Sequence, residues 1–229
     1  MIYKLQFDAL LPYLDVLARG LAFTIVLTLV STCAGILVGT LGASARTFGP
    51  TWLSRIVSGY VELIRNTPFI VQLFFIFFGL PALGVKMTEA QAAFLAMTIN
   101  LGAYSTEIIR AGIEAVPKGH IEAGLSLAMT KWEVLRNVIL KQAFQKIWPA
   151  LSSQIIIVML GSAVVSQISA EDLTYAANFI QSRNFRAFEV YIVAAIAYLL
   201  LAIAARAVLR GIGTRAILRG VGRVIFPKA

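Results

Sequence analysis

Charged residues are scarce in this sequence. Asp, Glu, Lys and Arg together make up only 14% of its 229 residues, against about 25% in ordinary globular proteins. Apolar residues reach 59%, and the mean hydropathy is +0.83. A soluble domain of this composition could not cover its surface with polar groups. The composition therefore excludes most cytosolic enzymes, disordered segments and disulfide-rich secreted domains, and it predicts an integral membrane protein.

Residues that form disulfides or bind metals are nearly absent. The single cysteine, Cys33, lies inside an apolar run, so we interpret it as a small buried hydrophobic residue. The single histidine, His120, offers no cluster of ligands. We therefore expect neither a metal site nor catalytic residues. The net charge of +9 comes from short segments between apolar runs, so we expect no nucleic acid as a partner.

Five apolar runs are long enough to form membrane-spanning helices. The first, Gly20–Ala45, has no charge and as a helix would extend about 39 Å, more than a hydrocarbon core of about 30 Å. Within it, the spacing of Gly35 and Gly39 is typical of close helix packing. We predict one all-α transmembrane domain over residues 1–229, with spans at about 20–45, 58–80, 88–109, 147–170 and 188–210.

Lys and Arg accumulate on one side of these spans. The connections after the first and third spans and the C-terminal segment hold most of them, whereas Asp and Glu balance the basic residues on the other side. Because cytoplasmic segments carry the excess of Lys and Arg, we predict an N-terminus outside the cytoplasm and a C-terminus inside it.

One long polar connection, about 111–146, separates the third and fourth spans. Pro117–Gly119 marks a turn, and apolar residues then recur at helical spacing over Ile121–Ala128. Thr130 and Glu133 fit a capping box at the start of a second helix. The pattern predicts a compact helical elbow on the cytoplasmic face. By shape alone, a docking surface and a plain connector are equally good interpretations.

Polar side chains lie along single faces of three predicted spans. Polar groups in lipid must face protein or a water-filled cavity, so we predict a polar lumen among the second, third and fourth spans. For any single residue, an interhelical hydrogen bond worth about 0.6 kcal/mol is the alternative. The candidate pathway residues are Arg65, Asn66, Gln72, Asn100, Tyr104, Glu107, Gln154, Ser162 and Ser166.

Two pairs of opposite charges lie near the cytoplasmic ends of the second and third spans. Glu62 and Arg65 are three residues apart, as are Glu107 and Arg110, so each pair shares a helix face. A charge inside the membrane is costly without a partner. We interpret both pairs as structural ion pairs at the membrane edge, with a contact to the substrate as the alternative.

The long connection resembles the EAA loop of binding-protein-dependent ABC importer permeases. The family pattern is Glu-Ala-Ala, three residues, Gly, nine residues, Ile, one residue and Leu-Pro. Glu122, Ala123 and Leu140 match this pattern, and Val138 is a near match. The departures, at the third Ala, the Gly and the Pro, are Gly124, Ala128 and Lys141.

Further segments resemble the polar amino-acid permeases, the group that carries histidine, glutamine, arginine or opines. The resemblance runs in consistent order from about Gly20 to Tyr191. The segments that carry it are Glu62–Pro68 with Gln72 and Leu73, Ala103–Arg110 with Val116–Gly119, and Val138–Ala143.

This resemblance implies the transmembrane-domain architecture of a type I ABC importer in a bacterial inner membrane. The chain would be a pathway subunit, not an enzyme, and would bind no cofactor. ATP and Mg would bind to the partner ATPase, in line with the lack of a G-x-x-x-x-G-K-[ST] loop in this sequence. The implied partners are two ABC ATPase subunits, a second permease subunit, a periplasmic solute-binding protein, the amino acid and the lipid bilayer.

The resemblance also implies which residues dock on the ATPase: Glu122, Ala123, Gly124, Leu125 and Trp132. The Glu122 carboxylate would pair with a basic group of that subunit, and the alternative is that it stabilises its own helix dipole. Leu125 and Trp132 would be apolar contacts, unless they pack against the permease itself. The sequence does not indicate which amino acid is carried.

Leu160 and Gly161 stand where many relatives carry a Lys-Asp pair. If a partner subunit supplies that pair, two similar permeases form a heterodimer, which we favour slightly over a homodimer. The main alternative function is an ion- or proton-coupled secondary transporter or a channel subunit. Against it, the sequence has no ionisable residue isolated in mid-span and no filter motif. A membrane-embedded enzyme is disfavoured because no catalytic motif occurs.

Overall fold

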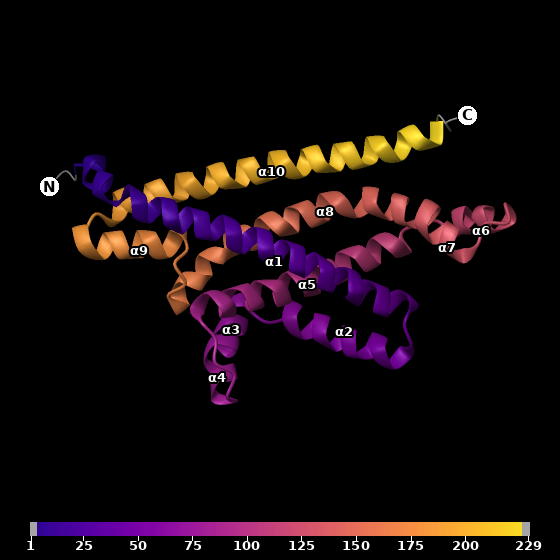
Figure 1. Ribbon diagram of the computed structural model, residues 1–229, viewed down its shortest axis with the longest axis horizontal. Coiled ribbons are helices and arrows are strands. Elements are labelled where there is room, and N and C mark those ends of the chain that lie inside the picture. Colours follow the sequence, from indigo (N-terminus) through magenta and orange to yellow (C-terminus); the bar gives the residue numbers. More distant parts are fainter. Residues whose placement is uncertain (1–3, 226–229) are drawn as a thin grey trace.

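The structure of the protein is a computed structural model that describes residues 4–225, except for the side chains of residues 131 and 216–225. Every regular element in this range is a helix. Four long helical segments lie along the long axis of the molecule (Figure 1). They are α1 (Leu14–Phe48), preceded by the 3₁₀ turn η1 (Phe7–Tyr13), α5 (Glu89–Glu114), α8 (Leu140–Gly161) and α10 (Ala187–Ile225).

The elements that join α5 to α8 and α8 to α10 lie at opposite ends of the molecule (Figure 1). At one end, α8 continues into the 3₁₀ turn η4 (Ser162–Ile168), and α9 (Leu173–Asn184) follows beside the N-terminus (Figure 1). At the other end lie α6 (Lys118–Ser126), α7 (Lys131–Val134) and the π-helical turn η3 (Leu135–Ile139), which runs directly into α8. Four segments are long and apolar enough to cross a membrane: Phe7–Phe48, Glu89–Glu114, Trp132–Ile168 and Ala187–Arg215.

The expected straight helix over 58–80 is broken. α2 (Thr51–Arg65) ends before Asn66, and the next segment, Phe69–Ala82, leaves it at an angle of 110°. That segment comprises α3 (Phe69–Phe74), the π-helical turn η2 (Phe75–Gly79) and α4 (Leu80–Ala82). Pro68 explains the break, because a residue that precedes proline avoids helical backbone angles and Pro68 itself caps α3. The bent pair gives a fifth membrane crossing if it counts as one span.

Glycines bring α1 and α5 into close contact. A Cβ atom added to Gly39 would lie 2.3 Å from the Ser105 Cβ, and one added to Gly35 would lie 2.9 Å from the Leu101 Cβ. Small residues at this spacing let two helix backbones approach closely. The structure therefore confirms the packing role predicted for Gly35 and Gly39.

The expectation that Cys33 is buried is wrong. Its thiol is free and the residue is exposed. The buried stripe of α1 includes Ser31 and Gly35, and Cys33 lies two residues from each. Two residues correspond to about 200° of helix rotation, so Cys33 points away from the α5 contact. The run around Cys33 is apolar on both faces, so hydropathy alone did not distinguish the face that contacts α5 from the exposed face.

Buried hydrogen bonds at the start of α9 fasten this helix to α1 and α10. Asp172 is fully buried and caps α9 by accepting a hydrogen bond from the Tyr175 N–H at 2.8 Å. The Tyr198 hydroxyl of α10 donates to its other oxygen at 2.8 Å. The Leu173 N–H donates to the Thr24 hydroxyl of α1 at 3.1 Å. Asp172 could not be singled out from the sequence, because its partner on α10, Tyr198, is 26 residues away.

Two replacements of Asp172 distinguish the contribution of its hydrogen bonds to stability from the contribution of its charge. Burial raises the pKa of the Asp172 carboxyl above its ordinary value, so its contribution to folding is largest below about pH 4 and is lost as the pH rises through the folded-state pKa. Asp172→Ala should destabilise the protein by about 1–3 kcal/mol because buried donors lose their acceptor. Asp172→Asn keeps an acceptor and cannot ionise, so thermal unfolding should show the wild type losing stability relative to Asp172→Asn as pH rises. A pH-independent difference would contradict this assignment.

Candidate coupling segment and translocation pathway

The predicted elbow is present and protrudes at one end of the helix array (Figure 1). α6 and α7 form its two arms, joined by residues 127–130. The predicted capping box is confirmed: the Thr130 N–H donates to the Glu133 carboxylate at 2.8 Å, and the Glu133 N–H donates to the Thr130 hydroxyl at 3.3 Å. The box stops α6 from continuing and sets the start of the second arm.

The elbow is fastened to both long helices from which it projects. Beneath it lies a small apolar core composed of Val116, Val134, Ile139 and Ala143. A hydrogen bond of 2.8 Å joins His120 Nδ1 to Gln142 Oε1, linking α6 to α8. The Lys146 ammonium donates to the Ala115 carbonyl, linking α8 to the end of α5. Displacement of the elbow would therefore be transmitted to α5 and α8 instead of being absorbed by a loose loop.

Four of the five predicted docking residues are exposed on the elbow. Glu122 and Ala123 lie on the exposed face of α6, while Leu125 is 47% exposed and Trp132 is 65% exposed. Gly124 instead is buried, and a Cβ there would lie 3.0 Å from a Val134 methyl carbon. Because Gly124 has no side chain, the two arms of the elbow can approach each other at this point.

Sequence reasoning missed the most exposed apolar side chain of the elbow. Leu127 is 78% exposed and follows directly after α6. The backbone there turns through Ala128, which has a φ of 58°, a left-handed conformation that favours glycine. This is the position where the family pattern has Gly. The left-handed turn therefore forms at Ala128 although this residue is not glycine.

An alternating chain of charges connects α1 and α5 near the elbow. Arg46 Nη1 lies 2.5 Å from Glu107 Oε2, and the other oxygen of Glu107 pairs with Arg110. Arg110 also pairs with Glu114 at 2.5 Å. The four charges sum to zero. The ion pair predicted between Glu107 and Arg110 is thus confirmed, and sequence reasoning missed that Arg46 joins it from another helix.

The second predicted ion pair does not form. Glu62 and Arg65 make no salt bridge, and the Arg65 guanidinium lies 5.5 Å from the ring centroid of Tyr104 instead. The side chains of Glu62 and Arg65 both line a cavity of about 320 Å³ between α1, α2 and α5. Its lining brings together four of the predicted pathway residues with two other charged groups: Arg65, Asn66, Tyr104 and Glu107, with Arg46 and Glu62. The spacing alone could not show that Arg65 turns toward α5.

Gln72 and Asn100 hold the bend between α2 and α3. The Gln72 amide nitrogen donates to the carbonyl of Ile64 at 2.7 Å and to that of Thr67 at 2.9 Å. Its oxygen accepts a hydrogen bond of 3.0 Å from Asn100 on α5. These bonds satisfy carbonyl groups that the end of α2 leaves without helical partners. The two residues do come together, but their polar groups are used within the protein.

The three candidate residues of the fourth span are not part of this cavity. Ser162 is fully buried and donates to the Met159 carbonyl, while Ser166 donates to the Ala163 carbonyl. Gln154 is partly exposed on α8. The regular spacing that suggested one polar stripe therefore includes two hydroxyls that bond within their own helix.

The cavity between α1, α2 and α5 brings together charged and polar groups that can bind a small polar solute. Over residues 4–225, no group of three His, Cys, Asp or Glu side chains lies close enough to hold a metal ion. The cavity presents guanidinium, carboxylate, amide and phenol groups, which can bind charged ends of a solute reversibly. Together with its long apolar helices and protruding elbow, these features define a multi-pass membrane permease.

Comparison with known proteins identifies the family. Residues 32–217 match the family described as "Binding-protein-dependent transport system inner membrane component", and the chain belongs to this family. It is 34% identical over 210 residues to the glutamine transport system permease protein GlnP of Escherichia coli (strain K12), covering 90% of this chain and 96% of that protein. It is 40% identical over 184 residues to the L-cystine transport system permease protein TcyB of Bacillus subtilis (strain 168), covering 80% and 79%.

Solved structures agree with this assignment. An amino acid ABC transporter crystallised with histidines has a chain of 37% identity, with a TM-score of 0.86 over 93% of this chain and 100% of that one. The MetNI methionine ABC transporter, at 22% identity and a TM-score of 0.71, shares the fold over 92% of this chain and 98% of its own.

The fold is therefore the predicted type I ABC importer transmembrane domain, in a multi-pass protein of the inner membrane. The chain is a transporter permease subunit and not an enzyme, and its partners include an ATPase subunit and a binding protein. Nothing in these comparisons supports a secondary transporter or a channel.

Proposed function

We propose that this chain is one of two pathway-forming subunits of an ATP-driven importer of polar amino acids or related opines. The names of its relatives, which include glutamine and cystine permeases, support that substrate class. ATP and Mg bind to two ABC ATPase subunits, and a periplasmic protein delivers the solute. The distribution of Lys and Arg supports a periplasmic N-terminus and a cytoplasmic C-terminus.

The exposed apolar surface of the elbow is the observation that carries this proposal. Leu125, Leu127 and Trp132 stand outside the helix array with no membrane-length helix to cover them. Glu122 adds a carboxylate with no partner within the described chain. An apolar surface beside a free charge suits a groove on another protein. The elbow lies on the predicted cytoplasmic side, where the ATPases must be.

The cavity between α1, α2 and α5 suits a free amino acid. Arg65 can bind the carboxylate of the solute and Glu62 its ammonium group, because neither side chain is used in an ion pair. Asn66, Tyr104 and Glu107 remain pathway residues in this proposal. Gln72 and Asn100 instead act by keeping neighbouring helices in place. Ser162 and Ser166 bond within their own helix, and Gln154 remains a candidate on α8.

A second, similar permease is the proposed partner across the pathway. At the position of the missing Lys-Asp pair, Leu160 is exposed and a Cβ on Gly161 would meet nothing within 4 Å. This open space suits charged side chains supplied by a different subunit. A purified complex that contains only one permease species would contradict the heterodimer while leaving the importer proposal intact.

Reconstitution tests the proposed function. The complete complex in vesicles, with its binding protein, should accumulate a radiolabelled polar amino acid only when ATP is on the ATPase side. Omitting either the ATPase subunits or the binding protein should abolish uptake. Uptake by the permease chain alone, or driven by an ion gradient without ATP, would overturn the proposal.

A further inference from the structure

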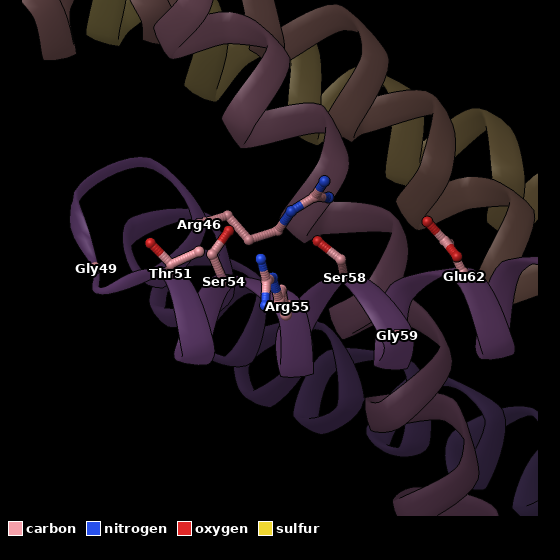
Figure 2. A pocket seen from close by; sticks show the side chains of 8 residues that line it. All are labelled: Arg46, Gly49, Thr51, Ser54, Arg55, Ser58, Gly59 and Glu62. Carbon is pink, nitrogen blue, oxygen red and sulfur yellow. The ribbon is translucent and has the colours of Figure 1, made fainter.

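A second groove runs along α2 and shares Arg46 and Glu62 with the amino-acid cavity. It has a volume of about 470 Å³ and lies between the end of α1 and α2. Figure 2 shows Ser54, Ser58 and Glu62 along one side of α2, with the Arg46 side chain extending across from α1. Arg55 lies between the two serines in sequence and also lines the groove (Figure 2).

Apolar side chains place this groove at the membrane surface. Arg46 is the first charged residue after the uncharged run Gly20–Ala45, so it marks the end of the apolar part of α1. Phe48, Trp52 and Ile56, which are neighbours in sequence of the residues that line the groove, are each about three-fifths exposed and thus available to lipid. Aromatic residues of this kind are enriched where hydrocarbon meets headgroups.

The end of the groove nearest the α1–α2 turn holds an arginine that no carboxylate neutralises, because the one carboxylate in the lining, Glu62, lies at the other end (Figure 2). Arg55 is exposed and has no carboxylate partner in the described chain. Arg46 uses one N–H group on Glu107, and a guanidinium has five. The Glu107 charge is itself shared with Arg110. The wall nearest the α1–α2 turn therefore offers two guanidinium groups and two serine hydroxyls, all hydrogen-bond donors, to an anion.

We propose that this groove binds the phosphate group of an anionic phospholipid. Guanidinium groups bind phosphate through paired N–H donors, and basic pockets between membrane helices on the cytoplasmic side bind lipid headgroups. The exposed Phe48, Trp52 and Ile56 would contact the acyl chains of the same lipid. Because lipid joins α1 to α2, its binding stabilises the α1–α2 turn next to the amino-acid cavity. A soluble anion would not contact these exposed apolar side chains, which favours a lipid over free phosphate.

Lipid retention and thermal stability test this proposal without any measurement of transport. The full-length protein is compared in phosphatidylcholine nanodiscs with and without phosphatidylglycerol, and lipids that survive detergent extraction are counted by native mass spectrometry. Phosphatidylglycerol should raise the melting temperature and remain bound. Arg55→Gln should weaken retention about fivefold, the factor expected for one basic residue near anionic lipid, and Ser58→Ala should weaken it less.

Arg19→Gln is the matched control, because Arg19 is an exposed arginine at the opposite end of α1. It should retain phosphatidylglycerol as the wild type does. Equal retention by Arg55→Gln and the wild type, or equal loss by Arg19→Gln, would overturn the proposal. Inorganic phosphate alone should not raise the melting temperature, and an equal rise with it would identify a soluble anion as the ligand and overturn the lipid assignment. Failure of uptake in the complete complex would leave all of these outcomes unaffected.

Discussion

Gly39→Leu is expected to prevent α1 and α5 from packing and to destabilise the protein by about 3 kcal/mol, at the upper end of the cost of overpacking. A Cβ at Gly39 would lie 2.3 Å from the Ser105 Cβ and 3.0 Å from the Thr106 backbone nitrogen. These neighbouring atoms belong to the α5 backbone or are attached directly to it, so they cannot move away from the added Cβ as the end of a flexible side chain could. Because α1 and α5 lie side by side over much of their length, the two helices must separate as a whole.

Thermal unfolding in detergent and the yield of monodisperse protein would measure this effect. Gly211→Leu is the matched control, since a Cβ at Gly211 in α10 would meet nothing within 4 Å. That variant should be neutral or slightly stabilising, because glycine is a poor helix former. Equal losses in both variants would show that loss of glycine itself, and not the close approach of α1 and α5, causes the effect.

The helices and the elbow could be predicted because their signals are local. An uncharged run of membrane length identifies α1 whatever lies beside it. Thr130 and Glu133 are three residues apart and satisfy each other. The break at Pro68 was also visible in the sequence, but the continuous hydropathy on both sides of it favoured one straight span. Hydropathy reports burial in an apolar medium and not the direction of the chain.

The cavity could be predicted only in part because its geometry depends on distant residues. Spacing showed that Glu62 and Arg65 share a helix face, but not that Arg65 would lie over Tyr104. Glu107 binds Arg46, which is 61 residues away in sequence. Gln72 looked like a pathway group because it is polar in an apolar run. Its actual partners are carbonyl groups that lack helical partners at the bend. The bend itself was not predicted from the sequence.

Trp132→Ala is expected to weaken docking of the ATPase by about 2 kcal/mol, or roughly 30-fold, the scale of an interface hot spot. Trp132 is 65% exposed on the elbow and offers the largest apolar surface there. ATP-driven uptake should fall accordingly when the ATPase subunit is below saturation and recover in part when it is in excess. The variant should remain folded, because Trp132 lies outside the small core that supports the elbow.

Trp52→Ala tests whether this loss belongs to the elbow. Trp52 is 63% exposed, almost as much as Trp132, but lies on α2. Its replacement should leave the affinity for the ATPase unchanged, as measured by co-purification over a range of ATPase concentrations.

Glu122→Ala should lower the affinity less than Trp132→Ala, because a charge at the rim of an interface mainly affects the rate of association. If Trp132→Ala bound and transported as the wild type does, the elbow would have to dock through Leu125 and Leu127 alone. If it retained normal affinity while uptake was lost, Trp132 would be needed to transmit motion through the elbow to α5 and α8 and not to bind the ATPase.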